Sequence, residues 1–169
     1  MKDVEIVKDV NGNDIVRINN IIFRGKQNID WKAVEVYLNK YIGMIVKVAD
    51  DEIHIEKDFP NEFAHSVYTK KLRGAYSKAK ANSTQGIIEM LKIAKFKRSM
   101  ANKKIKHNID ANNGWNYYIT RFALPVYNEK EKTITYNTYK ATLVVRISKG
   151  KKLKLYDITE IKKETSTPP

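Results

Sequence analysis

The sequence predicts an α+β fold in which N-terminal helices and short strands pack on a C-terminal antiparallel sheet. Within the first 94 residues, apolar side chains recur at helical spacing in two segments. After residue 114, three long segments alternate aromatic or apolar residues with polar ones, as half-buried strands do. Polar turn clusters separate these segments, so the strands are expected to form an antiparallel meander covered on one face by helices.

The first 27 residues are predicted to form a β-ribbon extension. The chain alternates over 4–10, turns at Asn11-Gly12-Asn13-Asp14 and is extended and apolar over 15–23. Residues 28–165 are assigned to one α+β domain, because a chain of 169 residues with 42% hydrophobic content suits a single core. The tail, residues 166–169, reads Ser-Thr-Pro-Pro and is expected to be disordered.

An amphipathic helix and two short strands are expected next. Apolar residues recur at helical spacing over 31–41, and Gly43 is a natural stop. The segments 44–48 and 52–55 are predicted strands around an Asp-Asp turn. The sequence Phe-Pro-Asn-Glu at 59–62 breaks the pattern and is expected to separate the two halves of the chain.

The second half begins with helices and ends with the meander. Two helices, or one with a break, are predicted over 70–94, with the junction near Asn82, where the sequence resembles a capping box. The three long strands are predicted over 115–126, 133–147 and 152–158.

Composition excludes several kinds of chemistry. Without cysteine there is no disulfide, no thiolate catalysis and no cysteine-ligated zinc. The three histidines, His54, His65 and His107, are far apart and have no carboxylate at ligand spacing, so neither a metal nor another cofactor is expected. No apolar run approaches the roughly 18 residues that span a bilayer, and the first residues lack a secretory signal pattern, so no membrane partner is expected.

The positive charge is concentrated in one window, residues 70–106. This window holds twelve Lys or Arg and one acid, Glu89, whereas the whole chain has a net charge of +13. Charged helix faces are usually solvated, but they normally mix both signs. A local excess of this kind attracts polyanions and indicates a nucleic-acid partner.

Eight motifs across residues 30–165 carry a family resemblance. They are Trp31-Lys-Ala-Val-Glu-Val-Tyr-Leu, Phe59-Pro-Asn-Glu-Phe, Tyr68-Thr-Lys-Lys-Leu-Arg-Gly-Ala, Lys78-Ala-Lys-Ala-Asn, Gly114-Trp-Asn-Tyr-Tyr, Arg121-Phe-Ala-Leu-Pro-Val, Tyr139-Lys-Ala-Thr-Leu-Val-Val-Arg and Leu155-Tyr-Asp-Ile. Together they resemble a domain family of large polyvalent proteins from phages and conjugative elements. That family is similar to the barnase, EndoU, colicin and RelE group of ribonuclease folds.

The resemblance implies a metal-independent endoribonuclease or toxin domain that cleaves RNA by attack of the 2′-hydroxyl on the phosphodiester. The implied partners are RNA, with tRNA among the candidates, and an acidic immunity protein. The implied site of action is the cytoplasm, with delivery as part of a larger phage, conjugative or secreted protein.

Cleavage of this type needs a base, an acid and cations around the phosphorane. His107 lies in the basic segment 103–110 and is a candidate for proton transfer, or else a solvated loop residue. His65 is the second candidate, because Tyr68, Thr69 and Lys70 beside it could hold a phosphate. His54, between two isoleucines, is expected to face solvent.

Two arginines on predicted strands are further candidates, and one of them joins the predicted catalytic site. Arg121 and Arg146 stand on predicted strands, and Arg121 is the better candidate for substrate contact; the alternative is a structural ion pair. Tyr117 and Tyr118 point to opposite faces, so one of them offers a stacking surface, and Tyr118 is the predicted one.

The predicted nucleic-acid contacts are basic residues of the window together with this tyrosine. They are Lys70, Lys71, Arg73, Lys78, Lys103, Lys104, Lys106 and Tyr118. Two alternatives to an endoribonuclease stay open at this point. One is a non-catalytic nucleic-acid-binding module of a mobile element, and the other is a basic face that docks an acidic protein.

Overall fold

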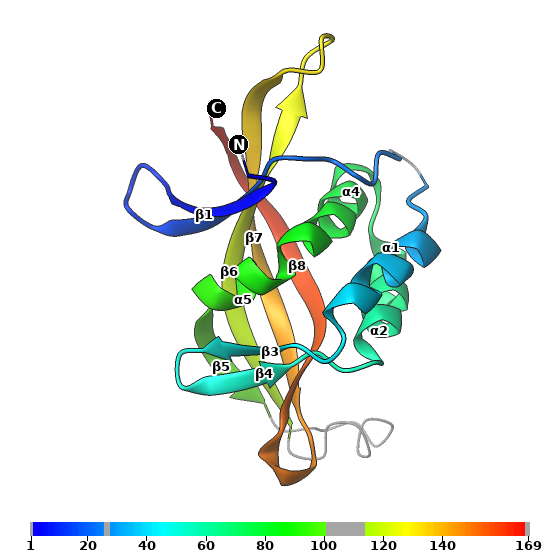
Figure 1. Cartoon of the computed structure of the whole chain (residues 1–169), viewed down its shortest axis with the longest axis vertical. Helices are drawn as coiled ribbons and strands as arrows, with labels where there is room; N and C mark the ends of the chain where they lie inside the picture. The colour runs from blue at the N-terminus through cyan, green and yellow to red at the C-terminus, as the bar shows by residue number, and fades with distance from the viewer. Residues whose placement is uncertain (1, 26–27, 101–113, 168–169) are drawn as a thin grey trace.

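The computed structural model describes residues 2–25, 28–100 and 114–167, and its centre is an eight-stranded sheet with helices on one face (Figure 1). The strand order is β1-β2-β6-β7-β8-β4-β3, and β5 pairs with β6. The α+β class is therefore confirmed. The strands are β1 (Val4–Lys8), β2 (Asp14–Ile18), β3 (Ile45–Val48), β4 (Asp51–His54), β5 (Lys95–Met100), β6 (Trp115–Tyr127), β7 (Thr133–Ile147) and β8 (Leu153–Thr167).

The predicted C-terminal meander is confirmed. Strands β6, β7 and β8 run antiparallel, with Trp115 opposite Arg146 in the register of β6 and β7. Asn128 organises the β6–β7 turn, because its Oδ1 accepts hydrogen bonds from the backbone amides of Lys130 and Lys132 at 2.9 and 3.0 Å. Strand β8 is longer than expected and pairs with β7 as far as Thr167, so the expected disordered tail is wrong for residues 166 and 167.

The short N-terminal strands extend the sheet instead of packing on its face. Strand β2 pairs in parallel with β6, with Val16 opposite Phe122, which joins the ribbon to the main sheet. At the opposite edge, the β3–β4 hairpin pairs with β8, with Ile53 opposite Leu153. The prediction that these short strands pack on the C-terminal sheet is therefore wrong. The physical reason is that the edge strands of the meander have unpaired backbone groups, which hydrogen-bond to other strands wherever those lie in the sequence.

Within the described residues, five helices cover one face. They are α1 (Trp31–Leu38), α2 (Phe59–His65), α3 (Val67–Lys71), α4 (Gly74–Ser83) and α5 (Ile87–Ile93). Helix α1 begins where predicted, with the Asp30 carboxylate accepting from the Ala33 amide at 3.1 Å. The break expected at 59–62 is wrong, because Pro60 stands in the first turn of α2, where a missing amide hydrogen costs nothing.

The junction near Asn82 is confirmed, but Asn82 does not cap a helix. Its buried side-chain Oδ1 accepts from the amides of Ile22 and Phe23 at 2.9 and 3.0 Å, and its Nδ2 donates to Phe23 O at 2.9 Å. These bonds fix the segment after the ribbon on the end of α4. A 3₁₀ turn over Thr84–Gly86 follows, and Gly86 permits close packing on β2, because a Cβ there would lie 3.0 Å from Val16 Cγ1.

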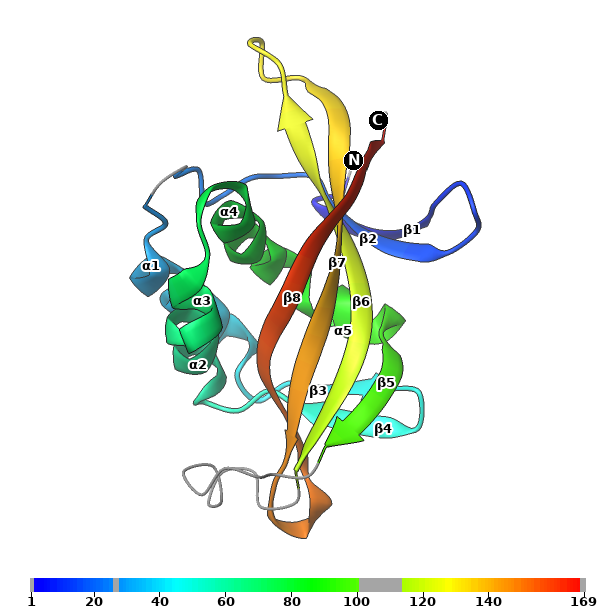
Figure 2. The same cartoon turned by 180° about the vertical axis from the view of Figure 1, so that it is seen from behind.

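The main core fills the space between α5 and the curled sheet. Helix α5 packs against β2, β3 and β6, which belong to three different parts of the sheet path (Figure 1). The fully buried core side chains include Met90 and Leu91 of α5 with Phe122, Leu143 and Ile158 of the meander. The opposite face of β6 and β7, turned to the viewer in Figure 2, carries none of the described helices.

Candidate nucleic-acid interface

The described part of the basic window is divided among three environments. Lys70, Lys71 and Arg73 are exposed around α3, and Lys78 is half-buried on α4. The exposed cations of β5 lie at the other end of the helical layer, on the strand beside β6. Lys80 is completely buried. The window therefore does not form the single basic face that its sequence suggests.

Strand β5 was not predicted from the sequence, and all six of its residues are exposed. The side chains of this strand do not alternate regularly between the two faces of the sheet. A register shift falls between Phe96 and Arg98. The alternation of basic and aromatic residues directly after α5 is the sequence pattern that could have predicted this strand. The bulge lets consecutive cations project from one edge strand, where charge also protects against unwanted strand pairing.

Aromatic rings lie directly beside these cations. The guanidinium carbon of Arg98 is 4.6 Å from the centroid of the Tyr117 ring, on the helix-free face. Phe96 is 57% exposed and packs edge-on against Tyr118, with ring centroids 5.6 Å apart. Lys97 Nζ lies 3.9 Å from Glu160 Oε2 of β8. We call Lys95, Lys97, Arg98 and Tyr117 the β5–β6 surface; Phe96 stands opposite the inward-facing Tyr118 and therefore lies on the other face of the sheet.

The prediction of Tyr118 as the stacking residue is wrong, because its ring is buried; Tyr117 is the neighbour that faces outward. Tyr118 is 1% exposed and faces the helices, and its hydroxyl donates to Asp51 Oδ2 at 3.2 Å. Burial raises the pKa of Tyr118 to about 12. Because adjacent strand residues point to opposite faces, the inward position of Tyr118 directs Tyr117 outward.

His65 is accessible and has a carboxylate partner. Its side chain is 38% exposed at the end of α2, and its Nε2 lies 2.8 Å from Glu35 Oε1 of α1. Lys32 Nζ lies 3.5 Å from the same oxygen. The hydrogen bond from His65 lowers the pKa of Glu35, and the nearby Lys32 charge adds to that effect. No sequence pattern indicates this pairing, since 30 residues separate the two partners.

The two hydroxyls proposed to hold a phosphate beside His65 are used inside the protein. Tyr68 is half-buried, and its hydroxyl oxygen accepts from the Ile161 amide at 2.9 Å. Burial raises the pKa of Tyr68. Thr69 is buried and donates from Oγ1 to Phe63 O at 2.7 Å. The prediction that Thr69 binds phosphate is therefore wrong, whereas Tyr68 stays half-buried and Lys70 is the exposed member of the group.

Arg121 forms structural ion pairs, which was the alternative to its predicted contact with substrate. Its guanidinium lies 2.9 Å from Asp9 Oδ2 and 3.1 Å from Glu164 Oε1, and it donates to Asp14 O at 3.2 Å. These bonds tie the tip of the β1–β2 ribbon to β6 and β8. Arg146 is likewise buried and paired with Asp58.

Lys80 and Asp157 form a buried ion pair that the sequence analysis did not predict. Their side chains are 0% and 4% exposed, and Lys80 Nζ lies 2.6 Å from Asp157 Oδ1 and 2.5 Å from Thr69 Oγ1. Burial lowers the pKa of Lys80 and raises the pKa of Asp157, and each charge partly offsets the other's shift. The sequence pattern that could have indicated the burial of Lys80 is the alanine on each side of it, Ala79 and Ala81, because small residues are typical of a closely packed helix.

The remaining predicted residues lie outside the described ranges. These are His107, Lys103, Lys104 and Lys106. Among the residues that the structure describes, no group of three or more His, Asp or Glu side chains is placed to hold a metal ion. Within the same residues, no helix has both the length and the apolar character needed to cross a membrane.

Comparison with known proteins adds no relative to this picture. No family model, curated protein or solved structure matches the chain. The fold and the candidate surfaces define an α+β protein with a cationic and aromatic edge strand, and any functional assignment depends on those surfaces.

Proposed function

We propose that this protein is a nucleic-acid-binding module that holds single-stranded RNA on the β5–β6 surface. The observation that carries the proposal is the Arg98 guanidinium over the Tyr117 ring on the helix-free face. Proteins that bind single strands combine cations, which follow the phosphates, with aromatic rings, on which unpaired bases stack. Lys95 and Lys97 supply the flanking charge.

The first test is the salt dependence of RNA binding. A short fluorescent single-stranded RNA should bind with an affinity whose log-log slope against salt is about −2, since three cations each contribute about −0.7 on a single strand. A duplex of the same length should bind more weakly, because paired bases cannot stack on Tyr117. Fluorescence anisotropy measures both. A salt-independent affinity, or a preference for the duplex, would contradict the proposal.

A second candidate function is RNA cleavage at the His65–Glu35 pair, as the resemblance to the barnase, EndoU, colicin and RelE group implies. The specific observation in its favour is the 2.8 Å contact between an accessible imidazole and a carboxylate that orients it. With Nε2 engaged by Glu35, the Nδ1 atom is left to exchange a proton with the ribose. The barnase-like fold, the toxin role and an acidic immunity partner belong to this second proposal.

Cleavage is tested by incubating the protein with total RNA and with tRNA in EDTA. Metal-independent cleavage should leave 2′,3′-cyclic phosphate ends, and His65→Ala should lower the rate by roughly 10²- to 10⁴-fold. His107→Ala is measured beside it because the sequence predicts that residue as well. His54→Ala is the matched control. Intact cleavage by both the His65 and the His107 variant would overturn this site.

The two proposals use different surfaces. Helix α2, which carries His65, and strand β5 lie on opposite sides of the long strands in both views (Figures 1 and 2). Variants at the β5–β6 surface should therefore leave the residues at His65 unchanged in structure, and variants at His65 should leave the RNA-binding surface unchanged. Binding without cleavage supports the first proposal alone.

A further inference from the structure

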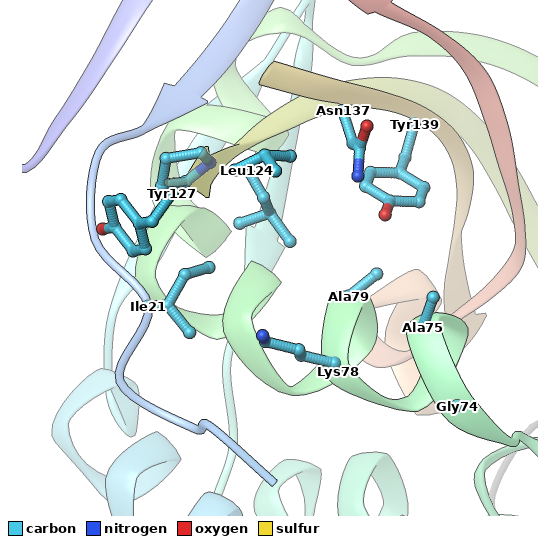
Figure 3. Close-up of a pocket in the computed structure, with 11 residues that line it drawn as sticks. Ile21, Gly74, Ala75, Lys78, Ala79, Leu124, Tyr127, Asn137 and Tyr139 are labelled. Carbon is cyan, nitrogen blue, oxygen red and sulfur yellow. The ribbon is translucent and has the colours of Figure 1, made fainter. Parts of the chain in front are cut away.

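Two hollows of the protein differ in what they offer to a ligand. A cavity of about 660 Å³ lies between α4 and the ends of β6 and β7 (Figure 3), but its polar residues Lys78 and Asn137 have partners within the protein and select no occupant. A second hollow, of about 470 Å³, lies between the tip of the β1–β2 ribbon and the start of β5. The ribbon and β5 lie beside the same edge of β6 (Figure 2). This second hollow is lined mainly by polar and charged side chains.

The second hollow adjoins the β5–β6 surface. It is lined by Lys95, which belongs to that surface, and by Ile119 and Arg121, which follow Tyr117 at alternate positions of β6. Side chains at alternate positions of a strand share one face, so the helix-free face leads from the Tyr117 ring to the hollow. The path along β6 from Tyr117 to Arg121 is about 13 Å long, at about 3.3 Å per residue.

The carboxylates that line the hollow are already engaged by cations of the protein. Arg121 lies 2.9 Å from Asp9 Oδ2 and 3.1 Å from Glu164 Oε1. Asp14 Oδ1 lies 2.7 Å from Lys8 Nζ. These ion pairs hold the tip of the ribbon in place and use the negative charge of the hollow.

Two lysines of the hollow stay available to an anion. Lys95 and Lys140 are exposed, and no carboxylate of the described residues forms an ion pair with either of them. In the register of the sheet, Lys140 stands between Arg121 of β6 and Lys162 of β8. Like charges directly opposite one another destabilise a sheet. A phosphate beside Lys140 would therefore relieve this repulsion as well as form an ion pair.

We propose that this hollow binds a phosphate of the same RNA strand that stacks on Tyr117, so that the strand runs along β6 toward the ribbon. Lys95 and Lys140 would contact the phosphate from β5 and β7, the two strands that flank β6 at this point. The inference rests on the proposed function, because it extends the RNA path beyond the β5–β6 surface.

The free edge of β6 favours RNA over an acidic peptide, which would match the same charge. A peptide that adds to a sheet needs a strand edge with which to form main-chain hydrogen bonds. Among the described residues, β5 pairs with β6 as far as Ile119 and β2 pairs with it from Phe122. Only Thr120 and Arg121 lie between them, which is too short for a peptide strand. A nucleic-acid strand needs cations and a stacking ring instead.

The experiment measures the binding of a single-stranded RNA of about ten nucleotides to the full chain by fluorescence anisotropy. Lys140→Met should weaken binding by about two- to fivefold, the effect of one exposed ion pair, and make the salt dependence shallower by about 0.7. Lys140→Arg should retain most of the binding. Lys163→Met is the matched control, because Lys163 is exposed but stands opposite the inward-facing Tyr139. Melting temperatures show that each variant is folded.

A second measurement locates the contact on the RNA. One phosphate at a time is replaced by a neutral methylphosphonate. At one position the replacement should weaken binding to the parent protein and have little effect on Lys140→Met, since that contact is already lost. Methylphosphonate effects that are the same in both proteins at every position would overturn the inference.

The inference and the proposed function fail in different ways. If Arg98→Ala/Tyr117→Ala weakens RNA binding but Lys140→Met does not, the proposed function stands and the inference is overturned. The inference is also overturned if Lys163→Met weakens binding as much as Lys140→Met does. Displacement of the RNA by a polyglutamate peptide of equal charge, at equal concentration, would assign the hollow to an acidic peptide instead. If no single-stranded RNA binds, both proposals are overturned.

Discussion

Replacing Asp157 by asparagine is expected to lower the free energy of unfolding by about 3 to 5 kcal/mol, the usual cost of leaving a buried charge without its partner. Lys80 Nζ is completely buried, and Asp157 lies 2.6 Å away as its counter-ion. The rings of Phe63 and Tyr68, 4.5 and 5.1 Å from Nζ, stabilise the ammonium only in part. Urea unfolding followed by tryptophan fluorescence measures the change.

A second variant separates the charge effect from simple loss of packing. In Lys80→Met/Asp157→Asn this site buries no ionised group. The amide oxygen at position 157 can still accept from the Ile158 amide, which donates to Asp157 Oδ1 at 2.8 Å in the parent protein. The double variant should therefore be more stable than Asp157→Asn alone. A double variant that is less stable than the single one would show that the pair contributes mainly through packing and hydrogen bonds.

The stability of Asp157→Asn should also depend on pH in a defined direction. Burial already lowers the pKa of Lys80, and removing the Asp157 charge lowers it further, whereas the unfolded chain keeps the ordinary value of about 10.4. Between these two pKa values the unfolded state binds more protons, so the variant gains stability relative to the parent as pH rises. Thermal melts from about pH 7 to 9.5 measure this gain, and an unchanged difference across that range would contradict it.

The second large effect is expected on RNA binding. The variant Arg98→Ala/Tyr117→Ala should weaken the affinity for single-stranded RNA by about 10- to 100-fold, because base–aromatic stacking contributes about 1–3 kcal/mol per base. Removing Arg98 also takes one cation from the surface, so the salt dependence should become shallower by about 0.7. Fluorescence anisotropy at several salt concentrations gives both quantities.

The control removes charge elsewhere. Lys130 and Lys132 are exposed in the β6–β7 turn, at the end of β6 far from β5 (Figure 1). The variant Lys130→Ala/Lys132→Ala removes two cations, one more than the test variant, without touching an aromatic ring of the β5–β6 surface. If the control weakens RNA binding as much as the test variant does, the affinity reflects net charge and not this surface.

Sequence patterns succeeded where local chemistry decides the structure. The three long strands could be predicted because alternation and the turn around Asn128 are local signals. Helix α1 could be predicted because Asp30 caps it directly. Helix α2 was missed because Phe-Pro-Asn-Glu is compatible with both a turn and a helical first turn, and the burial of Phe59 and Phe63 decides between them.

The candidate site was less predictable, since it depends on which residues meet. His65 was recognised as a candidate, but Glu35 became its partner only through the packing of α1 against α2. Arg121 was correctly placed on a strand, whereas its partners Asp9 and Glu164 come from both ends of the chain. The choice between Tyr117 and Tyr118 required knowing which side of β6 the helices cover.

The sequence by itself determined the α+β class, the meander and the concentration of positive charge between residues 70 and 106. Only the tertiary structure decided how that charge is used, burying Lys80 with Asp157, placing Lys78 at a cavity and exposing Arg98 beside Tyr117. The physical reason is that composition and periodicity act over a few residues, whereas the burial of a charge depends on residues brought together from distant parts of the chain.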